Sequence, residues 1–139
     1  MFSLFACLQI ITKDSFNGLK NLQNLDVSKL KNLERFDSDS LIQLRILSSI
    51  KIQTWPRIEK YRFRLGNLLA NVPSLRKLTV EIKESHLTDQ LIGSFNPKLK
   101  YLEITGSNLK SIEPDAFEGI EEVRKLVDSS HVFLSFNEN

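Results

Sequence analysis

The sequence predicts a repeat solenoid, a fold in which short similar units stack side by side around one continuous core. Two observations predict it. The apolar pattern L-x-x-L-x-L occurs four times, and a fifth copy begins near the C-terminus. The stretch "LQIITKDSFNGL", which starts at residue 8, is repeated as "LKSIEPDAFEGI" from residue 109, with Leu, Ile, Asp, Phe and Gly at the same places.

Each of the four copies places three apolar residues in a predicted strand of period two. These residues are Leu22, Leu25 and Val27; Leu47, Ile50 and Ile52; Leu75, Leu78 and Val80; and Leu99, Leu102 and Ile104. The fifth copy starts with Val123 and Leu126. The middle residues of successive copies lie 25, 28, 24 and 24 positions apart, together 101. The two ends of the chain therefore match because four repeat units separate them.

Composition supports one regular core. The 139 residues are enough for a single domain, 41% are hydrophobic, and 22 leucines stand beside only 5 glycines and 4 prolines. With 26% charged residues and a net charge of +2, the composition is not that of an intrinsically disordered chain. The net positive charge is also smaller than is usual for a domain whose whole surface binds nucleic acid. No apolar run reaches the ~18 residues that a membrane span needs. Cys7 is the only cysteine, which excludes an intrachain disulfide and a cysteine-based zinc site.

The clearest unit, residues 99–120, reads "LKYLEITGSNLKSIEPDAFEGI". It resembles the leucine-rich repeat family, whose units follow L-x-x-L-x-L-x-x-N/C-x-L. Its continuation, I-x-x-x-x-F-x-x-L, is similar to the animal extracellular type found in Toll-like receptors, slit and chaoptin-like proteins. The resemblance covers about residues 8–126. It implies an α/β leucine-rich-repeat solenoid with a concave parallel β-sheet and convex loops or short helices.

The resemblance also implies roles for residues within a unit. In the family, an Asn five residues after the middle leucine hydrogen-bonds the backbone of the turn. Here that position holds Leu30, Trp55, Lys83, Ser107 and His131, and only Ser107 is expected to make a comparable bond. In the clearest unit, Leu109 and Ile112 are expected to turn inward and Phe117 and Ile120 to close the convex side. Phe133 and Phe136 fall at the positions of Leu109 and Ile112 in the next unit.

The chain is expected to be one array, residues 1–139, with about four complete repeats, partial repeats at both ends and no caps. Arrays of the extracellular type are closed by cysteine-rich caps, and neither end has one. By register, Met1 falls at a strand leucine position. Open ends expose core leucines and invite association. The sequence therefore predicts a fragment or truncated form of a longer solenoid.

The predicted concave sheet is the first candidate site. Strand residues between the inward leucines point outward because side chains alternate. They are Asn24, Asp26 and Ser28; Ser49, Lys51 and Gln53; Lys77, Thr79 and Glu81; and Tyr101, Glu103 and Thr105. This mixed polar strip suits recognition of a protein surface. Tyr101 and Lys77 are the predicted anchors, because they are central and aromatic residues are enriched in binding hot spots.

A second candidate is the basic stretch "WPRIEKYRFRL", residues 55–65. Its cations are Arg57, Lys60, Arg62 and Arg64, and aromatic residues alternate with them. Such a patch suits an acidic protein, a sulfated glycan or RNA. The favoured alternative is that Tyr61, Phe63 and Leu65 pack inward while Arg62 and Arg64 face water.

No enzymatic constellation is present. His86 and His131 are far apart in sequence and lack ligand spacing, and Cys7 has no neighbouring base. The acidic run Asp37–Ser40 is expected to form a turn or a helix N-cap rather than a metal loop. We therefore expect no catalytic site, no cofactor and no metal.

The resemblance implies non-enzymatic protein–protein recognition, as part of an extracellular adhesion protein or receptor ectodomain. Its partner would be a protein ligand or a second copy, with an acidic glycan less favoured and nucleic acid not expected. An intracellular adaptor, such as the substrate-binding part of a ligase complex, is the alternative; the lone cysteine and the absence of Asn-x-Ser/Thr sequons favour it. A truncated product without function is the third reading.

Overall fold

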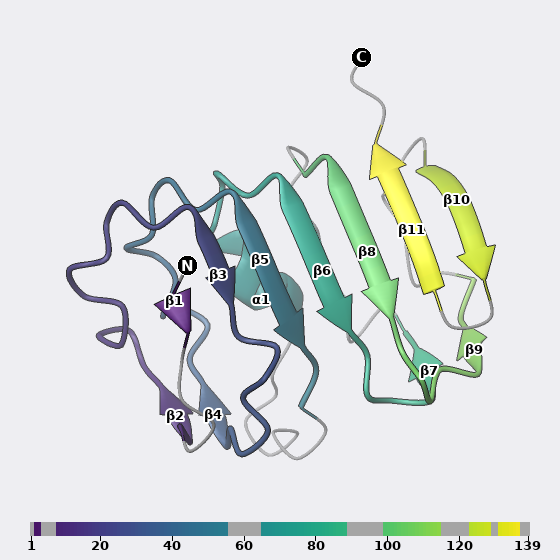
Figure 1. Cartoon of the computed structure of the whole chain (residues 1–139), viewed down its shortest axis with the longest axis horizontal. Coiled ribbons are helices and arrows are strands. Elements are labelled where there is room, and N and C mark those ends of the chain that lie inside the picture. The colour runs from purple at the N-terminus through teal and green to yellow at the C-terminus, as the bar shows by residue number, and fades with distance from the viewer. Residues whose placement is uncertain are drawn as a thin grey trace.

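The computed structural model describes residues 2–3, 8–55, 65–88, 99–114, 123–128 and 131–136, with side chains for 8–55, 65–67, 70–88 and 99–114. A seven-stranded sheet spans the molecule (Figure 1). Its strands stand in the order β1 (Phe2–Ser3), β3 (Asn24–Asp26), β5 (Ser49–Gln53), β6 (Lys77–Glu81), β8 (Tyr101–Thr105), β11 (His131–Phe136) and β10 (Val123–Asp128). The first five strands are parallel. The chain is therefore a parallel-sheet β-solenoid, which confirms the repeat prediction at that level.

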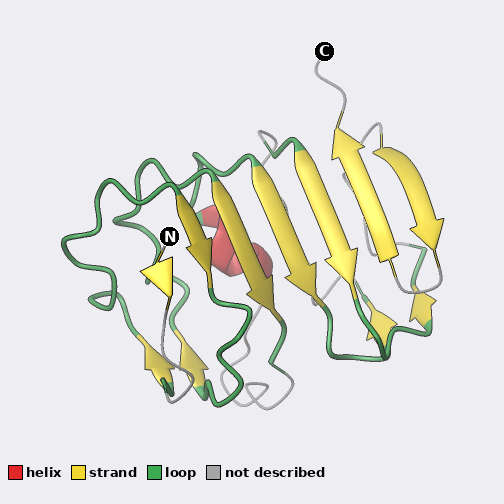
Figure 2. Ribbon diagram, in the orientation of Figure 1, coloured by secondary structure: helices red, strands yellow, loops and turns green. Residues whose placement is uncertain are grey.

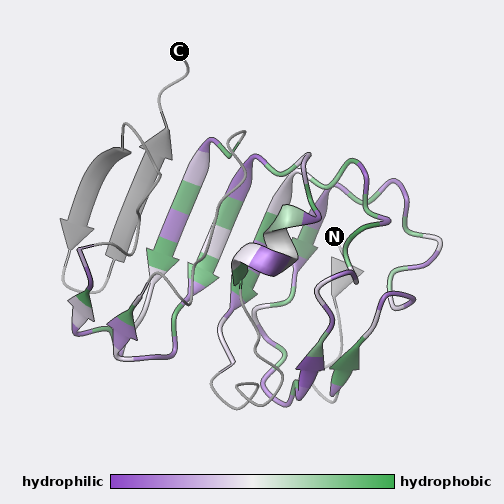
Figure 3. Ribbon diagram, turned by 180° about the vertical axis from the view of Figure 1, so that it is seen from behind, coloured by the Kyte–Doolittle hydropathy of each residue, from purple (hydrophilic) through white to green (hydrophobic). Residues whose placement is uncertain are grey.

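The repeated leucine positions form the core. Leu25, Ile50, Leu78 and Leu102 lie opposite one another in neighbouring strands and are all buried. Because strand side chains alternate between the two faces, the residues on either side of these positions remain on the polar face. Figure 3 shows this alternation along β6 and β8 as changes of hydropathy. Ile52, Val80 and Ile104 form a second buried row in β5, β6 and β8, and the core runs continuously from coil to coil.

Shared backbone acceptors tie each coil to the next. The carbonyl oxygens of Gln23, Ser48 and Arg76, just before three successive strands, each accept hydrogen bonds from two consecutive N–H groups of the following coil, at 2.8–3.0 Å. At the base of the molecule the carbonyls of Gln9 and Ser85 do the same. These contacts fix the register at the start of β5, β6 and β8 and again at the base of the molecule, so the coils cannot slide relative to one another without losing several bonds.

Two short sheets lie at the base of the coils (Figure 2). One pairs β2 (Ile10–Ile11) with β4 (Arg35–Phe36), and the other pairs β7 (His86–Leu87) with β9 (Ser111–Ile112). β2 and β9 belong to the two matching stretches at the ends of the sequence. The match therefore reflects that both stretches form a short strand at the base of a coil. Leu109 and Ile112 pack against the core, as predicted. Phe117 and Ile120 lie outside the described residues.

The described part of the chain contains one helix, α1 (Leu65–Ala70), which lies behind the sheet (Figures 1 and 2). It is short because Pro73 follows closely, and a residue that precedes proline disfavours the helical conformation. Asn71, just after α1, donates a side-chain hydrogen bond to the carbonyl of Ser38 at 2.6 Å, which ties the return segment to the preceding coil. Turns and short strands form the other described returns, so the solenoid has less helix than the α/β expectation implied.

Both ends of the sheet differ from the expected array. At the N-terminal end, Phe2 rather than Met1 lies opposite Leu25. At the C-terminal end, the fifth copy was expected to add a parallel strand beside β8. That expectation was wrong: β10 and β11 form an antiparallel pair, and β11 lies antiparallel between β8 and β10.

The hairpin also relocates two aromatic residues. Phe133 and Phe136 belong to β11 and not to the base of a further unit. Two β-prone stretches separated by two residues pair with each other at little cost in loop entropy, and antiparallel pairing is slightly more stable than parallel pairing. Pairing of β10 with β11 is therefore favoured over a further parallel strand of the repeat beside β8.

Truncation of a central core residue tests the continuity of the core. Leu78→Ala should lower the free energy of unfolding by about 2–5 kcal/mol, because the cavity would lie between two neighbouring coils. Ile46, which is 44% exposed, is the matched control, and Ile46→Ala should change stability by less than about 0.5 kcal/mol. Urea denaturation of both variants measures this. Equal losses in the two variants would contradict the assigned core.

Candidate functional site

The polar side of β3, β5, β6 and β8 forms the candidate site, and we call it the open face. It faces the viewer in Figure 1, opposite the side that α1 covers. Asn24, Lys51, Lys77 and Tyr101 are exposed on it, and Asp26, Ser28, Ser49, Thr79, Glu81, Glu103 and Thr105 are partly exposed. Eleven of the twelve predicted positions are thus accessible to a partner.

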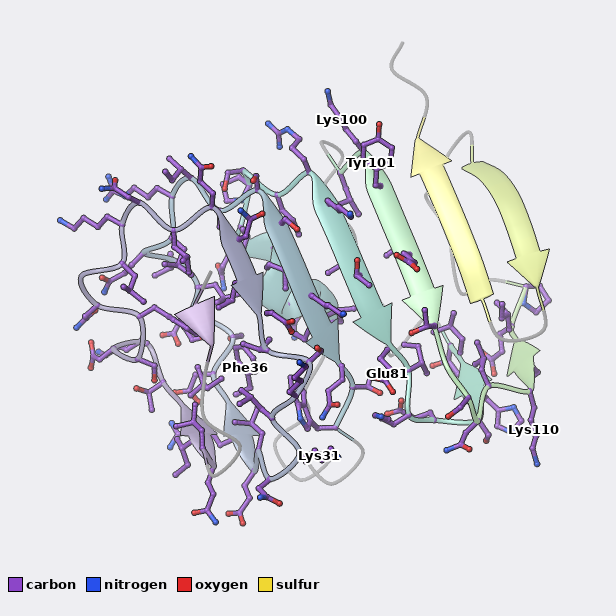
Figure 4. All side chains as sticks on the ribbon, viewed as in Figure 1. Lys31, Phe36, Glu81, Lys100, Tyr101 and Lys110 are labelled. Atoms are coloured by element: carbon purple, nitrogen blue, oxygen red, sulfur yellow. The ribbon has the colours of Figure 1, made fainter. Side chains whose placement is uncertain are left out.

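Parallel register arranges these residues in rows across the strands. One row is Asn24, Ser49, Lys77 and Tyr101, and the next is Asp26, Lys51, Thr79 and Glu103. Neighbours in a row are separated by about 4.8 Å, the spacing of adjacent strands. The two predicted anchors, Lys77 and Tyr101, are direct neighbours, and Tyr101 is 49% exposed at the start of β8 (Figure 4).

A hollow of about 500 Å³ lies on this face over β5, β6 and β8. It is lined by Lys51, Ile52, Lys77, Thr79, Glu81, Glu103 and Thr105. Two ammonium groups and two carboxylates therefore surround one depression. Glu81 also pairs with Lys83, with its Oε1 atom 2.5 Å from Nζ. This arrangement supplies hydrogen bonds and charge of both signs, but it has no nucleophile activated by a base.

Gln53 is the predicted open-face residue that the structure does not leave accessible. It is 5% exposed. In the amide orientation that satisfies both ends, it donates to the carbonyl of Ser28 at 2.7 Å and accepts from the indole Nε1 of Trp55 at 2.8 Å. Alternation along β5 correctly predicted the face of the sheet on which Gln53 lies. It did not predict that Trp55, together with the turn after β3, would enclose the Gln53 amide. Gln53 is therefore a structural residue.

Trp55 makes a buried hydrogen bond to the backbone at a position where the leucine-rich-repeat pattern has Asn. It occupies one of the expected Asn positions and is buried, and its single indole N–H is shared between the carbonyl of Leu30, at 2.7 Å, and the amide oxygen of Gln53. Its ring packs against Phe36, with the ring centroids 5.7 Å apart. The expectation that only Ser107 would make such a bond was wrong, because Trp55 makes one. An indole N–H donates a hydrogen bond as the side-chain amide of Asn does. The Trp at this position could therefore have been recognised from the sequence as a donor.

Thr54 is a second structural residue that sequence reasoning missed. Its side chain is buried, accepts a hydrogen bond from the backbone N–H of Lys83 at 2.8 Å, and donates to the carboxylate of Glu84 at 2.5 Å. It thus connects the turn after β5 to the turn after β6. Together with Trp55 it holds the lower border of the open face in place.

Asp26 carries the one resolved pKa shift among the described groups. Burial raises the pKa of its carboxyl, but hydrogen bonds from the hydroxyl and the backbone N–H of Ser28, at 2.6 and 3.0 Å, lower it, as do the charges of Lys51 and Lys29. The net result is a pKa below the ordinary value of 3.8. Asp26 therefore stays ionised under physiological conditions and keeps a negative charge beside Lys51.

The remaining predicted residues have other positions. Arg57, Lys60, Arg62 and Arg64 lie outside the described residues, so the basic patch stays a prediction. Trp55 is buried and is not a surface aromatic of that patch, whereas Leu65 packs inward as predicted.

The acidic run and His86 have structural partners. In the acidic run, Ser40 N–H bonds to the carbonyl of Asp37 at 3.1 Å, which makes a turn. His86 lies in β7, exposed, with Nδ1 2.5 Å from the hydroxyl oxygen of Ser111. Within the described ranges there is no cluster of three or more His, Cys, Asp or Glu that could bind a metal. No helix in those ranges is long and apolar enough to cross a membrane.

No family model matches the chain, and no curated protein and no solved structure is significantly similar to it. The likeness to leucine-rich repeats therefore rests on the chain's own residues. Those residues are the four in-phase copies of L-x-x-L-x-L and the matching stretches that form β2 and β9.

The role of Trp55 can be separated from its bulk. Trp55→Phe keeps an aromatic ring near Phe36 but removes the donor to the Leu30 carbonyl. The free energy of unfolding should therefore fall by about 1–3 kcal/mol. Tyr101→Phe removes an exposed hydroxyl and should leave stability within about 0.5 kcal/mol of wild type. Urea titration of both variants gives the comparison. Wild-type stability of Trp55→Phe would show that the indole N–H has no structural role.

The lowered pKa of Asp26 predicts a pH dependence. A carboxyl whose native pKa is depressed stabilises the fold above its unfolded pKa, and this contribution is lost as pH falls through the native pKa. Asp26→Asn should therefore be less stable than wild type at neutral pH, and the difference should shrink well below pH 3.8. Denaturant titrations at several pH values measure the difference. A gap that stays constant with pH would contradict the assignment.

Proposed function

We propose that this chain is a leucine-rich-repeat recognition module whose open face binds another protein. The observation that carries the proposal is the accessible row of polar residues centred on Lys77 and Tyr101 beside a charged hollow. Four parallel strands hold these side chains at fixed spacing. The face is therefore preorganised, and binding of a partner would cost little conformational entropy in ordering it.

The family assignment is supported by residues in both halves of a unit. The L-x-x-L-x-L residues are buried, except for the partly buried Leu22, and the later apolar positions at Ile11 and Ile112 lie in equivalent short strands. Trp55 supplies the turn hydrogen bond at the position where the family has Asn. In the proposed solenoid the open face is the concave side.

The composition of the hollow favours a protein partner over a small apolar ligand. Small-molecule sites are lined mainly by hydrophobic and aromatic side chains, whereas six of the seven residues around this hollow are polar or charged. A partner surface that offers a carboxylate to Lys51 and Lys77 and a cation to Glu103 would complement it. Tyr101 would supply the aromatic contact that is typical of binding hot spots.

We further propose that the module belongs to an adhesion protein or receptor ectodomain, because "SIEPDAFEGI" follows the extracellular pattern. The second candidate is an intracellular adaptor. The lone Cys7 and the absence of sequons favour it, since extracellular domains commonly carry disulfides and glycans. Both settings use the same open face.

Photo-crosslinking tests the open face directly. Benzoylphenylalanine would replace Tyr101 on the open face in one sample and Lys110, an exposed residue next to β9, in the control (Figure 4). Proteins selected from a display library with the wild-type chain would serve as probes. A partner of the open face should crosslink through position 101 and not through position 110.

Charge reversal gives the energetic measure for each selected partner. The double variant Lys77→Glu, Glu103→Lys keeps the net charge and should weaken binding by about tenfold or more, because it reverses the charge of the anchor Lys77 and of Glu103 beside the hollow. Lys110→Glu should leave affinity within about twofold of wild type. Partners that bind the double variant as tightly as the wild type would place recognition elsewhere and refute the proposal.

A further inference from the structure

Thr79 lies at the centre of the hollow on the open face. In the sheet register it stands between Lys51 of β5 and Glu103 of β8. On β6, Lys77 lies two residues before it and Glu81 two residues after it, so their side chains leave the sheet on the same face (Figure 4). Four long charged side chains therefore surround one short residue, and the hollow exists because its central position is short.

The hydrogen-bond donors of the hollow are unused. Within the described part of the chain, Lys51 and Lys77 form no salt bridge, and the hydroxyls of Thr79 and Thr105 make no hydrogen bond. Asp26 is the register neighbour of Lys51, but its Oδ1 already accepts two hydrogen bonds from the turn that follows β3. Two ammonium groups and two hydroxyls can therefore donate to an acceptor that enters the hollow.

The carboxylates of the hollow are less available. The Oε1 atom of Glu81 lies 2.5 Å from Nζ of Lys83, so an incoming cation would have to compete with that lysine. The binding capacity that is left over is mainly that of a site for an anion. Glu81 and Glu103 also limit the charge of this anion, because both would repel a dianion such as phosphate more strongly than a single carboxylate.

We propose that the hollow receives one carboxylate side chain, Asp or Glu, of the protein that binds the open face, and that Thr79 determines how far this side chain enters. The inference rests on the function proposed above and adds the residue class that the partner presents and the position that selects it. The volume of about 500 Å³ admits a whole side chain, since a water molecule takes only ~30 Å³. Lys51 and Lys77 then hold the carboxylate from two sides, and the Thr79 hydroxyl donates to it from the floor.

Other side chains are less favourable occupants of the hollow. A cationic side chain would meet Lys51 and Lys77 at close range. An apolar side chain would cover the ammonium groups and hydroxyls without offering them an acceptor, which costs free energy. The donors on the walls and floor therefore match a carboxylate and disfavour both alternatives.

Filling the hollow tests the site without changing a charge. The probes are proteins selected from a display library that crosslink through position 101, so that each binds the open face. Thr79→Met places a longer neutral side chain at the centre and should raise the dissociation constant about tenfold or more, because the carboxylate can no longer enter. Thr79→Val keeps the shape, removes only the hydroxyl and should cost about threefold to tenfold. Ser107→Met, at an exposed position after β8, is the control and should stay within about twofold.

Substitution on the probe identifies the inserted group. Each Asp and Glu of a selected probe is replaced by Asn or Gln, one at a time. One replacement should raise the dissociation constant about tenfold or more on the wild-type chain. On the double variant Lys51→Met, Lys77→Met the same replacement should cost less than about threefold, because the carboxylate has already lost its cations. Circular dichroism verifies that each variant is folded.

The outcomes separate this inference from the function proposed above. Probes that crosslink through position 110 and not through position 101 contradict both. Probes that crosslink through position 101 but bind Thr79→Met as tightly as the wild type, or tolerate the loss of every acidic residue, leave the open-face function standing and overturn the carboxylate assignment. A probe that depends on one of its own Lys or Arg residues in place of an acid overturns it equally.

Discussion

The parallel backbone ladder between successive coils is the interaction on which the rest of the structure depends. Each strand from β3 to β8 bonds to the strand one coil away, and single carbonyls such as those of Ser48 and Arg76 hold two N–H groups at the start of the next strand. A single coil buries too few apolar side chains to offset its conformational entropy. The ladder stacks the coils so that Ile50 and Leu78 share one core, and it simultaneously aligns the polar residues on the other face.

Much of the fold could be predicted from the sequence because its main signal is periodic. The leucine positions gave the parallel strands, and the matching stretches at the two ends gave the equivalence of β2 and β9. The C-terminal hairpin could not be predicted in this way. Val123 and Leu126 fit the repeat pattern, but they also fit a strand of a hairpin. The pattern alone does not decide whether a strand pairs in parallel with a distant strand or antiparallel with the next one in sequence.

The expected exposure of the candidate residues agrees with the structure where strand alternation decides it, and disagrees where a turn encloses the side chain. Lys77 and Tyr101 lie on the open face because their neighbours are core residues. Gln53 obeys the same alternation, yet it is enclosed by Trp55 of its own coil and by the turn at Ser28 of the preceding coil. The bond from Trp55 to Leu30 was overlooked because the family pattern names Asn, although the physical requirement is only a buried donor aimed at the turn.

The arrangement of charge around the hollow has a consequence for how a partner arrives. Lys51 and Lys77 come from β5 and from the start of β6, whereas Glu81 and Glu103 come from the end of β6 and from β8. Asp26 lies beside Lys51 and Lys83 pairs with Glu81, so charges of both signs alternate across the face of a chain whose net charge is +2. The field of alternating charges decays faster with distance than that of a net charge, and salt screens it beyond about 8–10 Å. Attraction over long range is consequently weak, and the pattern of charge acts on a partner only at close approach. A partner would meet this face at an ordinary diffusional rate and then be turned into one orientation.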